Sequence, residues 1–186
     1  GEIFDEAGVT GTFVLYDVSE DKFTGFNKSR AETRYIPAST FKIANSLIGV
    51  SVGAVENVDE ILPYGGGEHF MKAWENDMSL RDAIKISNVP IFQELARRIG
   101  HARMQENVKR LEYGNQNIGP AVDRFWLDGP IEISAVEQTL FIAKLAQNKL
   151  EVPAEYQEAV VEIIEIEKSD DATLYAKTGW QTATDP

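Results

Sequence analysis

The sequence predicts an α+β fold in which a central, mostly antiparallel sheet is built from both chain ends and flanked by helices. An all-helical lobe is inserted between the two ends. Strand-like segments lie near residues 12–26 and 173–177, whereas helical patterns fill the middle of the chain. With 186 residues and 43% hydrophobic content, the chain can form one globular domain. We expect a sheet lobe from about 1–38 and 154–186, and a helical lobe from about 39–153.

The first third of the chain predicts a hairpin followed by a helix. Residues 12–16 and 23–26 are rich in β-forming residues and are separated by a polar turn. Apolar residues then recur at helical spacing, which predicts a helix from Ser39 to Ile48 that ends at Gly49. The three glycines at 65–67 predict a loop.

The remaining elements are predicted mainly by their start and stop signals. Ser79 and Ser134 each begin a pattern typical of a capping box, so each is expected to open a helix. Two further helices are expected at 91–99 and 103–111, and another starts at Pro153. The apolar positions of that last helix are Val160, Ile163, Ile164 and Ile166. The acidic run 162–171 is expected to be a solvated helix face and loop.

Composition excludes several classes of function. The net charge of -12 argues against binding to nucleic acid or to anionic membrane surfaces. The absence of cysteine excludes disulfides, zinc–thiolate sites and a cysteine nucleophile. No apolar run approaches the roughly 18 residues of a membrane span. His69 and His101 have no partner at metal-ligand spacing, so no metal site is expected.

A candidate nucleophile and base lie three residues apart at Ser39 and Lys42. At the start of a helix, this spacing places both side chains on one face. A serine that transfers acyl groups needs a base within hydrogen-bond reach, and a neutral lysine can serve. The spacing alone is weak evidence, because Ser19 and Lys22 share it within a polar turn. The competing interpretation is a helix cap beside a solvated lysine.

The surroundings of Lys42 favour the catalytic interpretation. Its neighbours Phe41 and Ile43 are apolar. A free lysine has a pKa of about 10.4, so only about 1 in 2,500 is neutral at pH 7. Burial lowers that pKa by up to several units, which is the shift that a base requires.

Residues 37–47 (PASTFKIANSL) closely resemble the nucleophile segment of the class D β-lactamases. Three further motifs of that family follow in its order, and residues 123–127 (DRFWL) match its tryptophan segment. The resemblance covers nearly all of the chain and implies the β-lactamase/transpeptidase fold. The three motifs are Ser87-Asn88-Val89, Tyr113-Gly114-Asn115 and Lys177-Thr178-Gly179.

The resemblance implies a serine acyl-enzyme. Ser39 would be acylated by the β-lactam carbonyl. Lys42 would react with carbon dioxide to form a carbamate, which is the general base of acylation and deacylation, and no other cofactor is implied. Trp126 would donate its indole N–H to the carbamate. Val89 and Leu127 would keep the pocket dry, although each of these three residues could also be ordinary core.

The resemblance also implies how the substrate is held. Ser87 would relay protons between the two lysines of the site. Lys177 and Thr178, followed by Gly179, would bind the substrate carboxylate. Backbone N–H groups of the nucleophile and of Trp180 would form the oxyanion hole, typically worth about 3–4 kcal/mol per donor. Tyr113-Gly114-Asn115 is expected to have a structural role as a turn after a helix.

The implied substrate is a β-lactam antibiotic, the implied location is periplasmic or secreted, and the oligomeric state is left open. A non-hydrolytic β-lactam sensor domain is a second hypothesis. A penicillin-binding transpeptidase is a third, although its middle motif usually ends in asparagine where Val89 stands. Because family strands, a closing helix and a substrate-binding arginine have no match after residue 179, we expect a chain incomplete at its C-terminus. An inactive fragment is therefore a fourth hypothesis.

Overall fold

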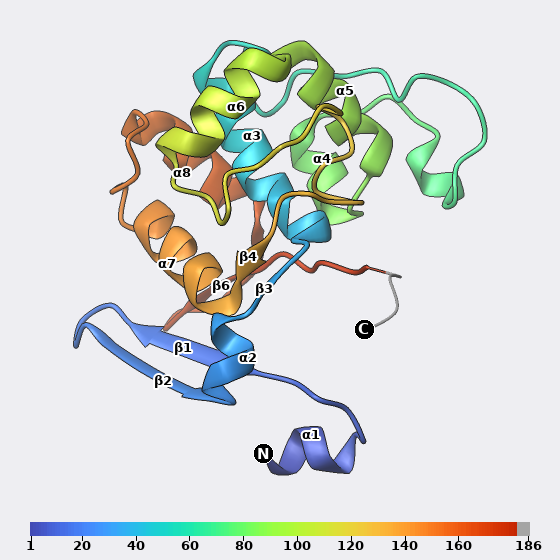
Figure 1. The fold of residues 1–186 in the computed structure, drawn as a ribbon. Coiled ribbons are helices and arrows are strands. Elements are labelled where there is room, and N and C mark those ends of the chain that lie inside the picture. The colour runs from blue at the N-terminus through green and yellow to red at the C-terminus, as the bar shows by residue number, and fades with distance from the viewer. Residues whose placement is uncertain (182–186) are drawn as a thin grey trace.

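A computed structural model describes residues 1–181, so residues 182–186 of the predicted sheet lobe lie outside the described part. The α+β class is confirmed: helices occupy the middle of the chain and strands occur toward both ends. Figure 1 shows the helices gathered in one body, with the first hairpin below them and α1 (Glu2–Glu6) set apart at the N-terminus.

The strands pair two by two. Within residues 1–181 they form three separate antiparallel pairs, not the one continuous sheet that we expected. The pairs are β1 (Phe13–Asp17) with β2 (Lys22–Phe26), β3 (Arg34–Tyr35) with β4 (Ile133–Ser134), and β5 (Glu165–Lys168) with β6 (Thr173–Tyr175).

One buried helix, α3 (Lys42–Ser51), is the centre of the hydrophobic core. Every residue from Lys42 to Val50 is buried, which is unusual for a stretch that contains a lysine, an asparagine and a serine. The helix lies among the other helices in Figure 1 and contacts three of them directly. These are α5 (Val89–Ile99), α6 (His101–Arg110) and α8 (Ala154–Ile163).

The expected end of this central helix at Gly49 is wrong, because α3 continues to Ser51. Gly49 lies inside the helix, and its role is close packing. A Cβ atom at this position would stand 2.7 Å from Cδ1 of Leu95 on α5. The glycine therefore allows two helices to approach, and this packing outweighs its low helix propensity.

Start signals predicted the helices well. Ser79 accepts a hydrogen bond from Asp82 N at the start of α4 (Leu80–Lys85). Ser134 and Glu137 form a complete capping box at the start of α7 (Ala135–Ala146). Such reciprocal bonds satisfy backbone donors that the first turn leaves free.

The end of the last helix was predicted less well than the helix starts. Ile166 was expected on the helix that begins after Pro153, but α8 ends at Ile163. Ile166 lies in β5 and is 60% exposed, and part of the acidic run is strand, not helix. Alternation of acidic and apolar residues in this run fits a strand with a period of two. The helix α2 (Lys28–Glu32) was not predicted.

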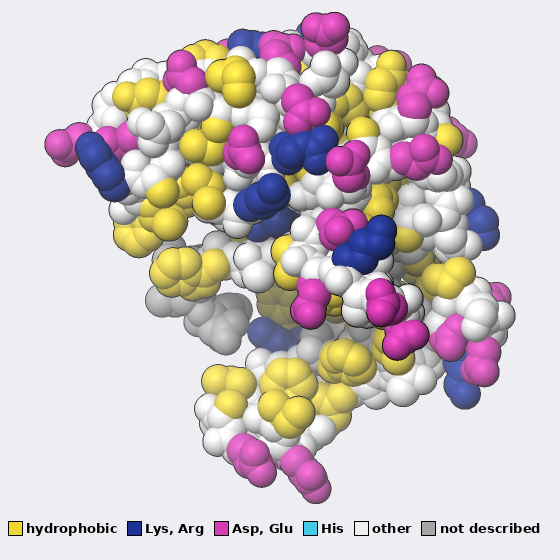
Figure 2. All heavy atoms as spheres, turned by 180° about the vertical axis from the view of Figure 1, so that it is seen from behind, with side chains coloured by type: hydrophobic (Ala, Val, Ile, Leu, Met, Phe, Trp, Pro, Cys, Tyr) yellow, Lys and Arg dark blue, Asp and Glu magenta, His cyan; other side chains and the backbone are white. Residues whose placement is uncertain are grey.

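The hairpins expose apolar surface. Phe13, Leu15 and Phe23 of the first hairpin are each between 44% and 55% exposed. Figure 2 shows hydrophobic side chains gathered over this lower part of the molecule. The well-buried part of the chain is therefore the helical body. Among residues 1–181, no helix is both long enough and apolar enough to cross a membrane.

Removing the capping box should weaken the junction of β3, β4 and α7. Arg34 binds Glu137 with Nη2–Oε1 at 2.5 Å, so the box also links two strands to the helix. We expect Ser134→Ala to lower the free energy of unfolding by about 1 kcal/mol. Urea denaturation measures this. Ser51→Ala is the control, because Ser51 caps no helix start. It should change the free energy of unfolding by only a few tenths of a kcal/mol.

Candidate active site

Ser39 and Lys42 meet at the start of the buried central helix. Ser39 lies in a 3-10 turn, Ala38–Phe41, that leads directly into α3. Lys42 Nζ donates a hydrogen bond to Ser39 Oγ at 2.6 Å. Ala38 before them has a φ of +48°, a left-handed conformation that is strained for a residue with a side chain. The predicted pair is therefore in direct contact.

Burial changes the protonation of Lys42. Its side chain is 0% exposed, although it carries an amine. Burial, and after it the positive charge of Lys177, lower the pKa of Lys42 to about 7. Burial acts this way because the charged form loses its hydration. Near neutral pH, roughly half of the molecules therefore hold a neutral amine that can accept a proton.

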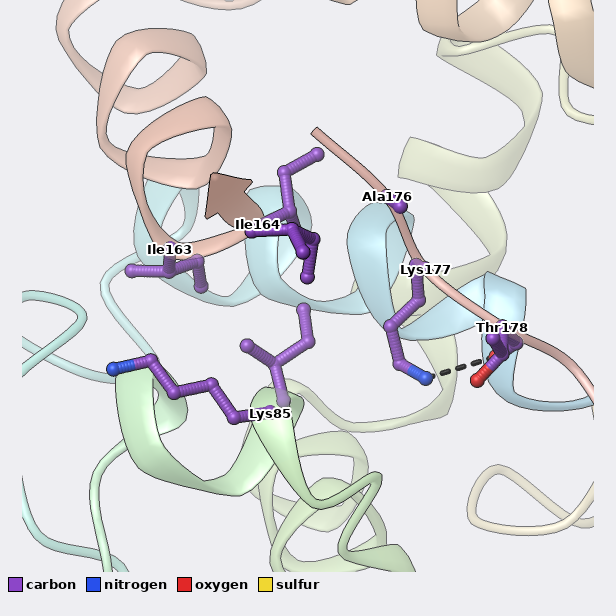
Figure 3. Close-up of a pocket in the computed structure, with 8 residues that line it drawn as sticks. Lys85, Ile163, Ile164, Ala176, Lys177 and Thr178 are labelled. Carbon is purple, nitrogen blue, oxygen red and sulfur yellow. Dashed lines mark hydrogen bonds between the residues drawn. The ribbon is translucent and has the colours of Figure 1, made fainter. Parts of the chain in front are cut away.

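A second serine and lysine pair lies beside the first. Ser87 stands between α4 and α5, and its φ of +55° is again left-handed. Lys177 Nζ donates to Ser87 Oγ at 3.0 Å and to the backbone oxygen of Thr178 at 2.8 Å. Figure 3 shows the Lys177 ammonium turned toward Thr178. Partial burial lowers the pKa of Lys177 as well.

The Lys-Thr-Gly segment lies against the nucleophile turn. A Cβ atom at Gly179 would stand 2.9 Å from both the Pro37 carbonyl oxygen and Cγ2 of Thr40. Only glycine allows this approach, so residue 179 brings two distant segments together. The segment continues past β6 as irregular backbone, whereas we expected the strand to extend to Lys177. Thr178, like Gly179 and Trp180, is exposed.

An apolar hollow of about 160 Å³ lies behind Lys177. Ile163 and Ile164 at the end of α8 form one wall, and Lys85 on α4 lies across from them, as Figure 3 shows. The Lys177 side chain thus separates this apolar hollow from the polar contacts with Ser87 and Thr178.

Trp126 is buried beneath the site with an unpartnered donor. Its ring is 0% exposed and stacks on Phe41, the neighbour of Lys42, with centroids 5.6 Å apart. Its indole Nε1 has no hydrogen-bond partner. Buried donors are almost always satisfied, so this atom indicates a place for an acceptor. Val89, at the start of α5, and Leu127, packed on the core, are both half-buried.

The structure therefore brings four of the predicted residues, Ser39, Lys42, Ser87 and Lys177, close together. It unites a serine hydroxyl, an amine that is partly neutral at pH 7 and a second, hydrogen-bonded serine and lysine pair. Such a set can attack a carbonyl carbon and move the released proton, which is the chemistry of acyl transfer.

Comparisons with known proteins agree with this geometry. Residues 11–186 match the family model described as the penicillin-binding protein transpeptidase domain. The β-lactamase OXA-19 of Pseudomonas aeruginosa is 42% identical over 95% of this chain. A crystal structure of FUS-1 (OXA-85), a class D β-lactamase from Fusobacterium nucleatum subsp. polymorphum, superposes with a TM-score of 0.95. It is 49% identical, and the match covers 97% of this chain and 75% of that one.

The chain belongs to the class D β-lactamase family. It spans 66% of the length of OXA-19, slightly less than two thirds. The regulatory protein BlaR1 of Bacillus licheniformis is also related, with 31% identity over 95% of this chain and 29% of its own length. In the present chain, no group of three histidine, aspartate or glutamate side chains within residues 1–181 could hold a metal ion.

The Tyr-Gly-Asn motif of this family member is a structural brace. Gly114 has a φ of +52°, and a Cβ atom there would stand 2.0 Å from the Glu132 carbonyl oxygen. Asn115 donates from its backbone to that same oxygen and from its side chain to Pro130. Tyr113 packs its ring edge against Phe41 with centroids 5.3 Å apart. The motif thus supports the turn before Lys42, as its expected structural role requires.

One residue next to the base was not predicted. Phe92 is fully buried on α5, and its ring centre lies 5.5 Å from Lys42 Nζ. It stands three residues after Val89, so helical spacing from the Ser-x-Val motif was the signal that could have identified it. Its ring keeps water from the amine and gives the charged form a weak cation–π contact.

Substitution of Gly114 should lower the stability of the fold far more than substitution of a glycine with free space around it. Gly53 also has a positive φ, of +66°, but a Cβ atom there would meet nothing within 4 Å. We expect Gly53→Ala to cost about 1–2 kcal/mol through backbone strain alone. Gly114→Ala should cost at least about 2 kcal/mol more, because the Glu132 carbonyl must move. Urea denaturation of both variants tests this, and equal losses would contradict it.

The buried amine should give the chain a characteristic dependence of stability on pH. The pKa of Lys42 is about 7 in the folded chain, and its ordinary value, which applies to the unfolded chain, is 10.5. Between these values the unfolded chain binds a proton that the folded chain does not, so stability rises with pH, by up to about 1.4 kcal/mol per pH unit. Lys42→Met should reduce this slope and stabilise the chain most below about pH 7.

Urea titrations across this pH window, in buffer free of carbon dioxide, measure the slope. Some slope should remain in Lys42→Met, because the pKa of Lys177 is lowered as well. An unchanged slope in the variant would show that Lys42 is not the group responsible.

Proposed function

We propose that this protein hydrolyses β-lactam antibiotics through an acyl-enzyme on Ser39. The observation that carries the proposal is the 2.6 Å hydrogen bond from the buried Lys42 amine to the serine hydroxyl. A pKa of about 7 lets that amine act as a base. The names of the relatives, OXA-19 and FUS-1, support β-lactamase activity.

In the proposed reaction, Ser39 Oγ attacks the lactam carbonyl carbon while its proton passes to the base at Lys42. The carbon–nitrogen bond of the ring then breaks, and the nitrogen receives a proton through Ser87. The bond from Lys177 Nζ to Ser87 Oγ supports this relay. Water then attacks the ester, Ser39 regains its proton, and the opened product leaves.

We infer that Lys42 acts as a carbamate formed with carbon dioxide. Bound in this form, the group supplies an oxygen base that is regenerated in both halves of the reaction. Lys42 would carry it, since only a neutral amine reacts with carbon dioxide and burial favours the neutral form. Trp126 would hold it, since its Nε1 donor is buried and without a partner. Val89 and Leu127 would limit access of water.

The substrate carboxylate would bind at Lys177 and Thr178, next to Gly179. The backbone N–H groups of Ser39 and Trp180 would bind the developing oxyanion. The packing of Gly179 against residues 37 and 40 supports this, because it brings both segments to one place. We further propose the division into sheet and helical lobes given above and export to the periplasm or the outside of the cell.

A second candidate is a β-lactam sensor that is acylated but does not release the product. The relation to BlaR1, named as a regulatory protein, favours it. The two candidates share Ser39 and Lys42 and differ only in the lifetime of the acyl-enzyme.

A mass-spectrometric time course with excess penicillin and bicarbonate tests the proposal. We expect an adduct on Ser39 that appears and then decays as hydrolysed penicillin accumulates. Decay should slow at least about tenfold when carbon dioxide is removed, because the base is then lost. Ser39→Ala should form no adduct.

Trp126→Phe is the matched variant, since it removes the N–H donor and retains an aromatic ring at the buried position. Its adduct should form and then persist. A long-lived adduct in the unsubstituted chain as well would favour the sensor. Absence of any adduct on Ser39 would rule out both candidates.

A further inference from the structure

The conformation of Ser87 raises the question of what holds it in place. A left-handed serine, here at φ +55°, costs on the order of 1–3 kcal/mol and persists only where its surroundings impose it. Backbone bonds from Ser87 N to Ile84 and from Asn88 N to Ala83 hold the turn to the end of α4. These two bonds fix the turn only to α4. Other contacts hold it to the loop before α4.

One tryptophan of that loop binds the residues on both sides of Ser87. Trp74 Nε1 donates to the backbone oxygen of Ile86 at 3.1 Å. The backbone oxygen of Trp74 accepts from Asn88 Nδ2 at 3.3 Å. Trp74 itself ends a short 3-10 segment, Lys72–Trp74, that fixes its direction. The two bonds form a bracket around Ser87.

Asn88 is the central residue of this bracket. Its side chain is 0% exposed and uses both ends of its amide. Oδ1 accepts from Ile91 N and caps α5, while Nδ2 reaches Trp74 O and, at 3.5 Å, Met78 Sδ. The amide therefore connects the start of α5 with the loop and places the turn between them.

We propose that Asn88 is a positioning residue for Ser87, which it holds against Lys177 through the bracket formed with Trp74. It acts through another residue and does not touch the reacting atoms. The geometric part of the proposal stands on these contacts alone. Its effect on acylation rests on the proposed function.

The bracket has a consequence for the two lysines. Ser87 Oγ accepts from Lys177 Nζ, and the positive charge of Lys177 acts on Lys42. Lys177 is the only charged group within residues 1–181 that shifts the pKa of Lys42. If Ser87 moves, Lys177 Nζ loses this acceptor and is free to move away from Lys42, so its positive charge acts on Lys42 more weakly. This weaker repulsion raises the pKa of Lys42 toward its ordinary value.

Two variants remove the bracket from opposite ends. Asn88→Ser keeps an oxygen that can cap α5 but is too short to reach Trp74. Trp74→Phe keeps an aromatic side chain and removes the bond to Ile86. The matched control is Asn107→Ser on α6. Asn107 is 5% exposed and donates to a backbone oxygen, that of Arg103, at 2.8 Å, but it lies outside the site.

The first measurement is the titration of Lys42, followed by NMR of lysine labelled with ¹³C in buffer free of carbon dioxide. We expect the midpoint, about 7 in the unsubstituted chain, to rise by about half a unit or more in both bracket variants. Asn107→Ser should leave the midpoint unchanged while losing comparable thermal stability. If Asn88→Ser does not fold, Trp74→Phe decides.

The second measurement is the rate of acylation by a fluorescent penicillin. We expect about a tenfold decrease in both bracket variants and none in Asn107→Ser. Because both variants break one bracket, the double variant should lose less than the product of the two single effects. If the unsubstituted chain is not acylated, the proposed function fails, and the titration still tests the bracket. An unchanged Lys42 midpoint in folded bracket variants overturns the inference.

Discussion

The burial of the Lys42 amine against Ser39 Oγ is the constraint on which the rest of the structure depends. A charged lysine in a fully buried position is unfavourable, so the surroundings stabilise the neutral form and lower its pKa to about 7. This state requires a dry environment, which α5, α6 and α8 provide by packing around α3. The apolar core of this chain therefore does more than stabilise the fold, because it also sets the chemistry of one amine.

Holding that amine in place requires strain and close packing in the neighbouring backbone. Ala38 and Ser87, the residues that carry or precede the two serine hydroxyls, both have left-handed conformations. Each is held by a close contact of another segment. Gly179 packs on the nucleophile turn, and the bracket of Trp74 and Asn88 holds the second serine. Strained positions that are held in this way are typical of preorganised sites.

The two lysines of the site influence each other through the charge of Lys177. Lys177 reaches Ser87 by a hydrogen bond, and its charge lowers the pKa of Lys42. In the proposed reaction the amine nearer the nucleophile is the base, while Lys177, which is only half-buried, binds the anionic part of the substrate. The same residue type takes two roles because the two positions differ in exposure to water.

The sequence by itself determined the helices after residue 38, the first hairpin and the order of the motifs. Local patterns carried this information: helical spacing around Ser39, a serine cap at Ser79, a capping box at Ser134, and the glycine in the turn at 113–115. It also indicated Lys42 as the base, because its chain neighbours are apolar. Through the resemblance to a known family, it named the other members of the site.

Only the tertiary structure decided which contacts these residues make. Gly49 lies within a helix because Leu95 packs on it, and Ile166 lies in an exposed strand and not in a helix. The contact of Gly179 with the nucleophile turn, the position of Phe92 beside Lys42 and the bracket around Ser87 connect segments far apart in the chain. Local patterns report on neighbours within a few residues, whereas the pKa of a buried amine depends on every segment that excludes water from it.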